Sequence, residues 1–214
     1  MSRWRGNRLR VGRRRGNERG QGLVEFAIVV PVFMMMLLGM LEFGTAFNHQ
    51  LTLGYATREG ARIAADMVNG GGALGCLTGS PNYQSPNAAN VDPVIIEAVD
   101  RVLSSAGSPI PLSQVTQVRI FKATTTGGDS GSGQNWKYTS TLNTLPDGTK
   151  VNFIFDTGNW GACNRSNAIN VSTGKVDSVG IAITYAYKGI TPIAANLPMS
   201  DVTVMQFNPT NTAG

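Results

Sequence analysis

The longest apolar segment of the chain is a run of 16 residues without a charged side chain, Phe26–Leu41. Extended to Leu23–Phe43, the segment includes Glu25 and Glu42 near its two ends. A helix over these residues would be about 31 Å long, close to the ~30 Å thickness of a bilayer's hydrocarbon core. Met34–Leu38 leaves no polar stripe of the kind that a core helix of a soluble protein keeps. The pattern therefore predicts a transmembrane helix.

Helical spacing continues beyond the apolar run to about Val68, where a glycine-rich segment follows and ends the helix. Four apolar residues recur every fourth position and form a stripe along this stem: Phe43, Phe47, Leu51 and Tyr55. Many alanines and glycines share the stem, which favours close helix packing. The stripe could pack on this protein's own domain or against another subunit, and the sequence leaves both possibilities open.

The polar remainder of the chain predicts α+β structure. Ser178–Tyr187 alternates between large apolar and small residues with a period of two, which is typical of a strand buried on one face. A short helix is expected from Asp92, as its N-cap, to about Ser104, and residues 127–135 have the composition of a loop. The other strand candidates are Gln114–Ala123, Trp136–Thr141, Lys150–Asp156 and Asp201–Phe207, with a turn at Pro146–Gly148.

We therefore expect an α+β fold in which a long N-terminal transmembrane and stem helix precedes an extracytoplasmic domain with an antiparallel sheet and one short helix. The predicted divisions are a basic cytoplasmic leader at 1–20, the transmembrane and stem helix at 21–69, and the extracytoplasmic domain at 70–214.

Charge is concentrated in the first 20 residues, whose eight arginines and single acid, Glu18, give a net charge of +7. The remaining 10 basic and 12 acidic residues give −2, so the basic character belongs to the leader. Because positive flanks stay in the cytoplasm, the carboxyl-terminal part is expected outside, with a single pass through the cell (inner) membrane. Membrane lipids, not nucleic acid, are the expected partners of the arginines.

Two cysteines, Cys76 and Cys163, both lie beyond the membrane segment. An even count in an exported domain predicts one disulfide between them. The alternative is two unrelated buried thiols.

No catalytic or metal-binding constellation is expected, and neither is a cofactor. Gly128–Gly131 (GDSG) matches the nucleophile tetrad of chymotrypsin-like proteases, but a serine nucleophile needs a histidine base. The single histidine, His49, lies in the stem helix. One histidine and two distant cysteines also do not supply the usual zinc ligand sets.

Several elements around the membrane segment occur together in the order of a known family. They are Arg19-Gly20-Gln21, Leu23-Val24-Glu25-Phe26, Pro31, Phe43-Gly44 and Ala56–Arg62. In this combination, residues 17–66 resemble the TadE-like family, minor pilin-like proteins of the tight-adherence (Tad, type IVb or Flp) pilus machinery. Gly189–Pro192 is a weaker similarity near the carboxyl end.

The resemblance implies maturation by a prepilin peptidase, with the cut between Gly20 and Gln21 and with Glu25 as the fifth residue of the mature chain. It also implies a non-enzymatic role in pilus biogenesis and adhesion, with other Tad pilus and inner-membrane assembly proteins as partners. On a helix the new amine of Gln21 lies one turn from Glu25, whose carboxylate could pair with it in the same chain or a neighbouring one and so serve assembly.

Two other interpretations remain open from the sequence. The chain could be a secreted binding module whose signal peptide is cleaved after Gly44-Thr45-Ala46. It could also be an uncleaved membrane-anchored binding module or hydrolase, although the missing catalytic and metal-ligand sets count against a hydrolase.

Overall fold

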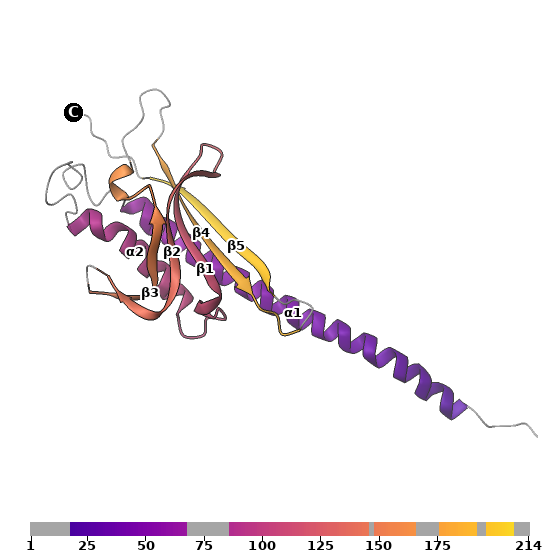
Figure 1. Ribbon diagram of the computed structural model, residues 1–214. Helices are drawn as coiled ribbons and strands as arrows, with labels where there is room; N and C mark the ends of the chain where they lie inside the picture. Colours follow the sequence, from indigo (N-terminus) through magenta and orange to yellow (C-terminus); the bar gives the residue numbers. More distant parts are fainter. Residues whose placement is uncertain (1–17, 68–85, 146–147, 166–175, 192–195, 208–214) are drawn as a thin grey trace, which may run out of the picture. The chain divides into compact units, whose positions relative to one another are not determined.

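The computed structural model describes residues 18–67, 86–145, 148–165, 176–191 and 196–207 of the chain. It divides into two compact units, residues 1–41 and residues 42–214. The elements are α1 (Glu18–Asp66), α2 (Pro86–Leu103), the 3₁₀ turn η2 (Leu112–Gln114), β1 (Val115–Ala123), β2 (Asp129–Thr144), β3 (Lys150–Gly158), the 3₁₀ turn η3 (Ala162–Asn164), β4 (Ser178–Tyr187) and β5 (Leu197–Gln206) (Figure 1). A long amino-terminal apolar helix, an antiparallel sheet and a short helix confirm the predicted α+β class.

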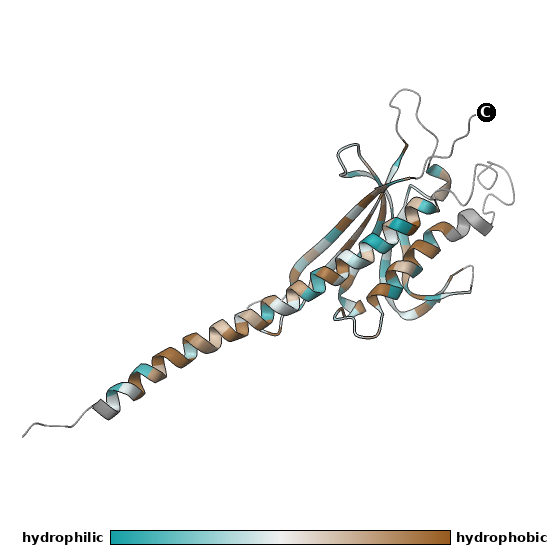
Figure 2. Ribbon diagram, turned by 180° about the vertical axis from the view of Figure 1, so that it is seen from behind, coloured by the Kyte–Doolittle hydropathy of each residue, from teal (hydrophilic) through white to brown (hydrophobic). Residues whose placement is uncertain are grey.

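The first unit consists, in its described part, of the amino-terminal half of α1. Apart from Val30, its large apolar side chains are exposed, from 39% for Leu37 to 71% for Met35. Figure 2 shows that hydrophobic residues predominate along this part of the helix. Within the described residues this helix is the one element long and apolar enough to cross a membrane. A water-soluble helix does not expose such a surface, because each large apolar side chain left in water forgoes about 1.5–3 kcal/mol of burial free energy.

The second unit is built on a five-stranded sheet with the order β3-β2-β1-β4-β5, in which all neighbouring strands are antiparallel. The part of α1 from Glu42 onward and α2 both lie on one face of this sheet (Figures 1 and 2). The predicted alternation of β4 is confirmed. Its large residues, from Val179 to Tyr187, are at most 2% exposed and belong to the core beneath the helices.

Small residues let α1 approach the sheet and α2 closely. Ala56, Ala61 and Ala64 are fully buried. At Gly60, a Cβ atom would lie 2.7 Å from Cγ2 of Val99 on α2 and 3.5 Å from Ile181 on β4. Three elements therefore meet at a position where only a hydrogen side chain fits.

Three predicted starts are wrong: those of β5, which begins at Leu197 and not at Asp201, of the short helix and of β2. The short helix begins at Pro86, not at Asp92, so Pro93 lies inside α2. A proline there removes one helical hydrogen bond. Full burial of Val91, Ile95 and Val99 offsets that loss, and packing decides against the local N-cap signal. Asp92 does not cap the helix but binds the buried guanidinium of Arg165.

The segment predicted as a loop at 127–135 is mostly strand, because β2 begins at Asp129. Its polar residues are fixed by a cross-strand partner that local composition does not reveal. The Arg119 guanidinium on β1 pairs with Asp129 at 2.6 Å and donates to Asn135 at 2.8 Å. At Gly133 a Cβ atom would lie only 2.6 Å from the backbone oxygen of Ile120, so glycine is required for this close pairing.

The predicted turn between β2 and β3 lies partly outside the described residues, since 146 and 147 are not described. Its closing hydrogen bond is present, from the Leu145 amide to the Thr149 carbonyl at 2.7 Å. Gly148 has a φ of 92°, a conformation that favours glycine.

Candidate functional site

The three residues predicted to act in processing and assembly lie together at the amino end of α1. Gly20, Gln21 and Glu25 are all exposed. The Gln21 side-chain amide donates a hydrogen bond to Glu25 Oε1 at 3.2 Å, across one helical turn. Apart from the helix's own backbone, no atom of the described residues lies within 4 Å of the position of a Cβ at Gly20. Packing in the folded chain therefore does not require a glycine here, and its small size can instead serve binding in a protease cleft.

Gly20 is helical here, whereas a protease cleft binds an extended backbone. Helix α1 begins at Glu18, so Gly20 belongs to its first turn. The first four amides of a helix have no intrahelical acceptor, and helix ends fray readily. Unwinding this turn to expose the bond between residues 20 and 21 therefore sacrifices few hydrogen bonds.

A second cluster, which the sequence did not predict, surrounds the carboxylate of Glu42 in the second unit. Glu42 Oε1 accepts hydrogen bonds from the Tyr187 hydroxyl at 2.8 Å and from the Ile190 amide at 3.2 Å. Glu42 Oε2 accepts from the Thr191 amide at 2.9 Å. One carboxylate thus ties the segment that follows β4 to α1, and this segment contains the weaker family similarity at residues 189–191.

The polar contacts continue one turn at a time along the same side of α1. The hydroxyl of Thr45 lies 2.7 Å from the Tyr187 hydroxyl, and His49 Nδ1 lies 2.9 Å from the Tyr185 hydroxyl. Tyr185 donates its own proton to Gln114 Oε1 at 2.6 Å. Because this proton is already committed, His49 Nδ1 must be the donor to Tyr185, which assigns the neutral ring to its Nδ1–H form.

Burial, with a smaller contribution from Tyr187, raises the pKa of Tyr185 to about 12. Its hydroxyl therefore keeps its proton throughout the physiological range, and the chain of hydrogen bonds from His49 to Gln114 is not interrupted by ionisation.

The edge strand β5 is attached to α1 by Asp201. Gln50 Nε2 donates to Asp201 Oδ1 at 3.3 Å, and the Thr57 hydroxyl donates to Asp201 Oδ2. Thr57 also lies 3.0 Å from the hydroxyl of Thr203. Together with the Glu42 cluster, these contacts fix one side of α1 to β4 and β5 with polar groups.

The predicted apolar stripe of α1, in contrast to its polar side, is not covered by the sheet. Phe43 is 74% exposed, Phe47 57%, Leu51 45% and Tyr55 61%. The described part of this protein's own domain therefore leaves the stripe uncovered, and of the two possibilities left open by the sequence, packing on the protein's own domain is not the one observed.

The remaining candidates are separate from these clusters. Cys163 lies in η3, whereas Cys76 lies outside the described residues, so the bridge between them stays a prediction. In the GDSG segment, Asp129 is bound by Arg119 and by the Gly131 amide. Among the described residues, no three side chains of the metal-ligating types lie close together.

Comparison with known proteins gives a match to a protein family. Residues 20–62 match a family described as TadE-like protein. No curated protein and no solved structure is a significant match to this chain. The matched segment begins at the predicted processing glycine and includes Glu25, Glu42 and the whole apolar stripe, but ends before the sheet.

Proposed function

With residues 20–62 forming a TadE-like segment, we propose that this protein is a minor pilin-like subunit or assembly factor of a Tad (type IVb, Flp) pilus, matured by a prepilin peptidase and acting in pilus biogenesis and adhesion. The family match, together with the one exposed apolar helix found among the described residues, supports a single-pass membrane protein associated with a Tad pilus. The exposed apolar surface of α1 carries the proposal, because only a bilayer or other apolar helices can cover it.

The proposed orientation places the leader in the cytoplasm and the sheet domain outside the inner membrane. It rests on the +7 charge of the first 20 residues, which are directly followed by the apolar segment. The same orientation brings Gly20 to the cytoplasmic face, where a prepilin peptidase acts.

Assembly is proposed to use two separate surfaces of α1. The first surface lies on the membrane side and is formed by Glu25. Its carboxylate lies one turn from residue 21, and cleavage would release the amine of that residue. The stripe from Phe43 to Tyr55 is the outer surface, because it is apolar, exposed and helical in spacing. Other subunits of the pilus machinery are the proposed partners of both.

A secreted form cleaved after Ala46 is the less favoured alternative. Such a cut would remove Glu42 and Thr45, which bind Tyr187 and the amides of Ile190 and Thr191. An uncleaved anchored binding module keeps those contacts but leaves the fixed spacing between Gly20 and Glu25 without a purpose.

The mature amino terminus distinguishes the three forms. Mass spectrometry of the protein from membranes is expected to find a chain that begins at Gln21. A start at Phe47 would indicate a signal peptide, and a start at Met1 an uncleaved anchor.

A matched pair of variants tests the role of Gly20. Gly20→Leu is expected to accumulate full-length precursor, whereas Gly22→Leu is expected to mature normally. The helix has open space at both positions, so both leucines fit the folded chain equally. Normal maturation of Gly20→Leu, or an equal block in both variants, would contradict processing at this site.

A further inference from the structure

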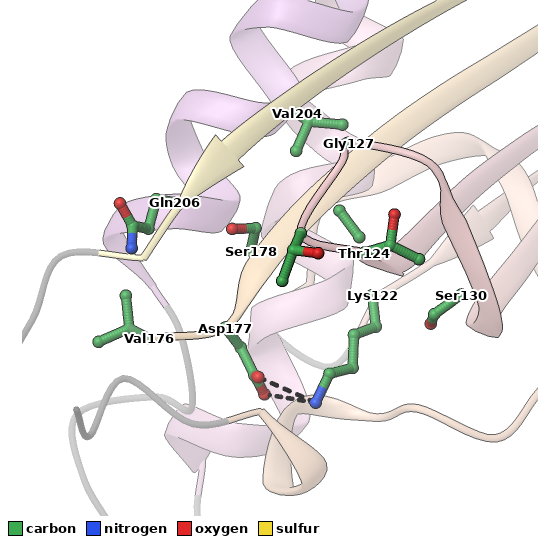
Figure 3. Close-up of a pocket in the computed structure, with 11 residues that line it drawn as sticks. Lys122, Thr124, Gly127, Ser130, Val176, Asp177, Ser178, Val204 and Gln206 are labelled. Atoms are coloured by element: carbon green, nitrogen blue, oxygen red, sulfur yellow. Dashed lines mark hydrogen bonds and ion pairs between the residues drawn. The ribbon is translucent and has the colours of Figure 1, made fainter. Parts of the chain in front are cut away.

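A pocket of about 660 Å³ lies where the β1–β2 hairpin meets the beginning of β4 and the end of β5 (Figure 3). Lys122 and the hairpin line one side, and Val176–Ser178, Val204 and Gln206 line the other. This volume is large enough for a ligand of one or two rings, within the usual range of small-molecule sites. None of the proposed processing or assembly residues lines it.

Several polar groups in the pocket are free to bind a ligand. Within the part of the chain that the structure describes, the hydroxyls of Thr125 and Ser178 and the carboxamide of Gln206 have no side-chain hydrogen-bond partner. Each hydroxyl can donate one hydrogen bond and accept others, and the carboxamide does both. The pocket thus presents mixed donors and acceptors, with no single charge dominating.

Lys122, the one cation that the described residues contribute to the lining, is already neutralised. Lys122 Nζ lies 2.9 Å from Asp177 Oδ1 and 3.0 Å from Oδ2 (Figure 3). An anionic ligand would have to compete with this carboxylate, and a cationic ligand with the ammonium group. The pair still offers a donor and an acceptor side by side, which suits two neighbouring hydroxyl groups.

The rim formed by the hairpin is held in place by its own hydrogen bonds. The Thr124 amide donates to the Gly128 carbonyl at 2.7 Å, and the Gly127 amide donates to the Thr124 carbonyl at 2.9 Å. The Thr124 hydroxyl accepts from the Gly128 amide at 3.0 Å. A rim that is already ordered loses little conformational entropy when a ligand binds.

From this lining we propose that the pocket binds a neutral carbohydrate of one or two sugar rings. Its hydroxyl groups match the free donors and acceptors of Ser178, Gln206 and Thr125, and its C–H faces match the aliphatic surfaces of Val176 and Val204. A wholly apolar ligand would leave these polar groups desolvated and unpaired.

The contact is expected to be weak for one copy and effective for many. The lining contains no aromatic ring among the described residues, and most of its hydroxyls remain exposed to water. A dissociation constant in the millimolar range is therefore expected. Copies presented together on a surface would bind a glycan-coated target through avidity. This adhesive use rests on the proposed function, whereas the binding itself does not.

The test is a titration of the full-length protein in micelles of a detergent without a sugar headgroup, with ¹³C-labelled valine methyl groups. Lactose, maltose and N,N′-diacetylchitobiose are the neutral probes, and inorganic phosphate is the charged probe. At least one disaccharide is expected to shift the methyl signals of Val176 and Val204 saturably, with Val118 in the core unchanged.

Ser178→Ala combined with Gln206→Ala is expected to raise the midpoint of that titration at least about tenfold, since two hydrogen bonds are lost. Ser140→Ala, an exposed serine of β2 outside the pocket, serves as the control and should leave it unchanged. No saturable shift up to about 50 mM of any disaccharide, saturation by phosphate alone, or equal effects of the pocket and control variants would each overturn the proposal. Such a failure leaves processing at Gly20 untouched, because the titration requires neither cleavage nor a pilus.

Discussion

Gly60 is the position where the packing of α1 can be tested most directly. A methyl group there would lie 2.7 Å from Val99 Cγ2, so the neighbour would have to move by about 1 Å to reach ordinary contact distance. Val99 is fully buried and β-branched, and therefore cannot rotate out of the way without a clash elsewhere. Overpacking of this kind costs about 1–3 kcal/mol, whereas the better helix propensity of alanine returns only about 1 kcal/mol.

The difference between these two terms is about 0–2 kcal/mol, so we expect Gly60→Ala to lower the free energy of unfolding by up to about 2 kcal/mol and the Tm by up to about 8 °C. Gly60→Val should lower both further, because its extra methyl groups also meet Ile181, which is 3.5 Å from the position of the Cβ. Gly44→Ala is the matched control, since Gly44 lies in the same helix with no atom within 4 Å of a Cβ. It should be neutral or raise the stability by up to about 1 kcal/mol through helix propensity alone.

The assay is thermal unfolding of the full-length protein in micelles, followed by the fluorescence of Trp136 and Trp160, which are 6% and 3% exposed. The expected order of stability is Gly44→Ala, wild type, Gly60→Ala and Gly60→Val. If Gly60→Val were as stable as the wild type, the close approach of α1 to α2 would not exist in the protein, and the packing of the stem described above would be wrong.

Three further predictions concern assembly, covalent structure and the buried ion pair. Glu25→Ala is expected to be cleaved and inserted normally but to give no surface pili by electron microscopy. Gln21→Ala removes the side-chain partner of Glu25 but keeps the backbone amine, so this variant should keep its pili. Normal piliation of Glu25→Ala would exclude the assembly role. A Cys76–Cys163 bridge predicts that alkylation of folded, non-reduced protein labels neither thiol, and labelling of both would rule the bridge out. Arg165→Leu is expected to destabilise the second unit by about 3–5 kcal/mol in thermal unfolding, because it leaves the Asp92 carboxylate without the fully buried guanidinium that neutralises it. Arg165→Lys should recover only part of the lost stability. An Arg165→Leu variant as stable as the wild type would refute the stabilising role of this ion pair.

The parts of the fold that the sequence predicts well are those whose signals are local. The apolar run of α1 and the alternation of Ser178–Tyr187 each reflect one element's own burial pattern, and β4 has the predicted bounds. The beginning of β2 was not predictable in this way. Its amino-terminal residues resemble a loop in composition, and their stabilising partner, Arg119, lies on another strand.

The candidate site likewise has a part with a local sequence signal and a part without one. The spacing of Gly20, Gln21 and Glu25 falls within two helical turns, so a short motif reveals it. The contact between Glu42 and Thr191 joins residues 149 positions apart, and neither residue carries a signal that names the other. The one available hint was a carboxylate placed at the carboxyl-terminal end of an apolar segment, because such a charge requires partners.

The long sequence separation of the α1 contacts has a consequence for the order of events during export. The partners of Thr45, His49, Gln50 and Thr57 lie 136 to 151 residues later in the chain, on β4 and β5. If the leader stays in the cytoplasm as proposed, and the residues after the apolar segment cross the membrane in chain order, the stem helix emerges early. The strands that cover its polar side then arrive among the last residues. Forming contacts at such separation is slow, because the loop-closure entropy is lost before the contacts form. In the proposed orientation, the stem would therefore lie outside the membrane with both its polar side and its apolar stripe uncovered until the strands arrive. A chaperone or neighbouring subunit that binds early would meet a different surface from one that binds the finished domain.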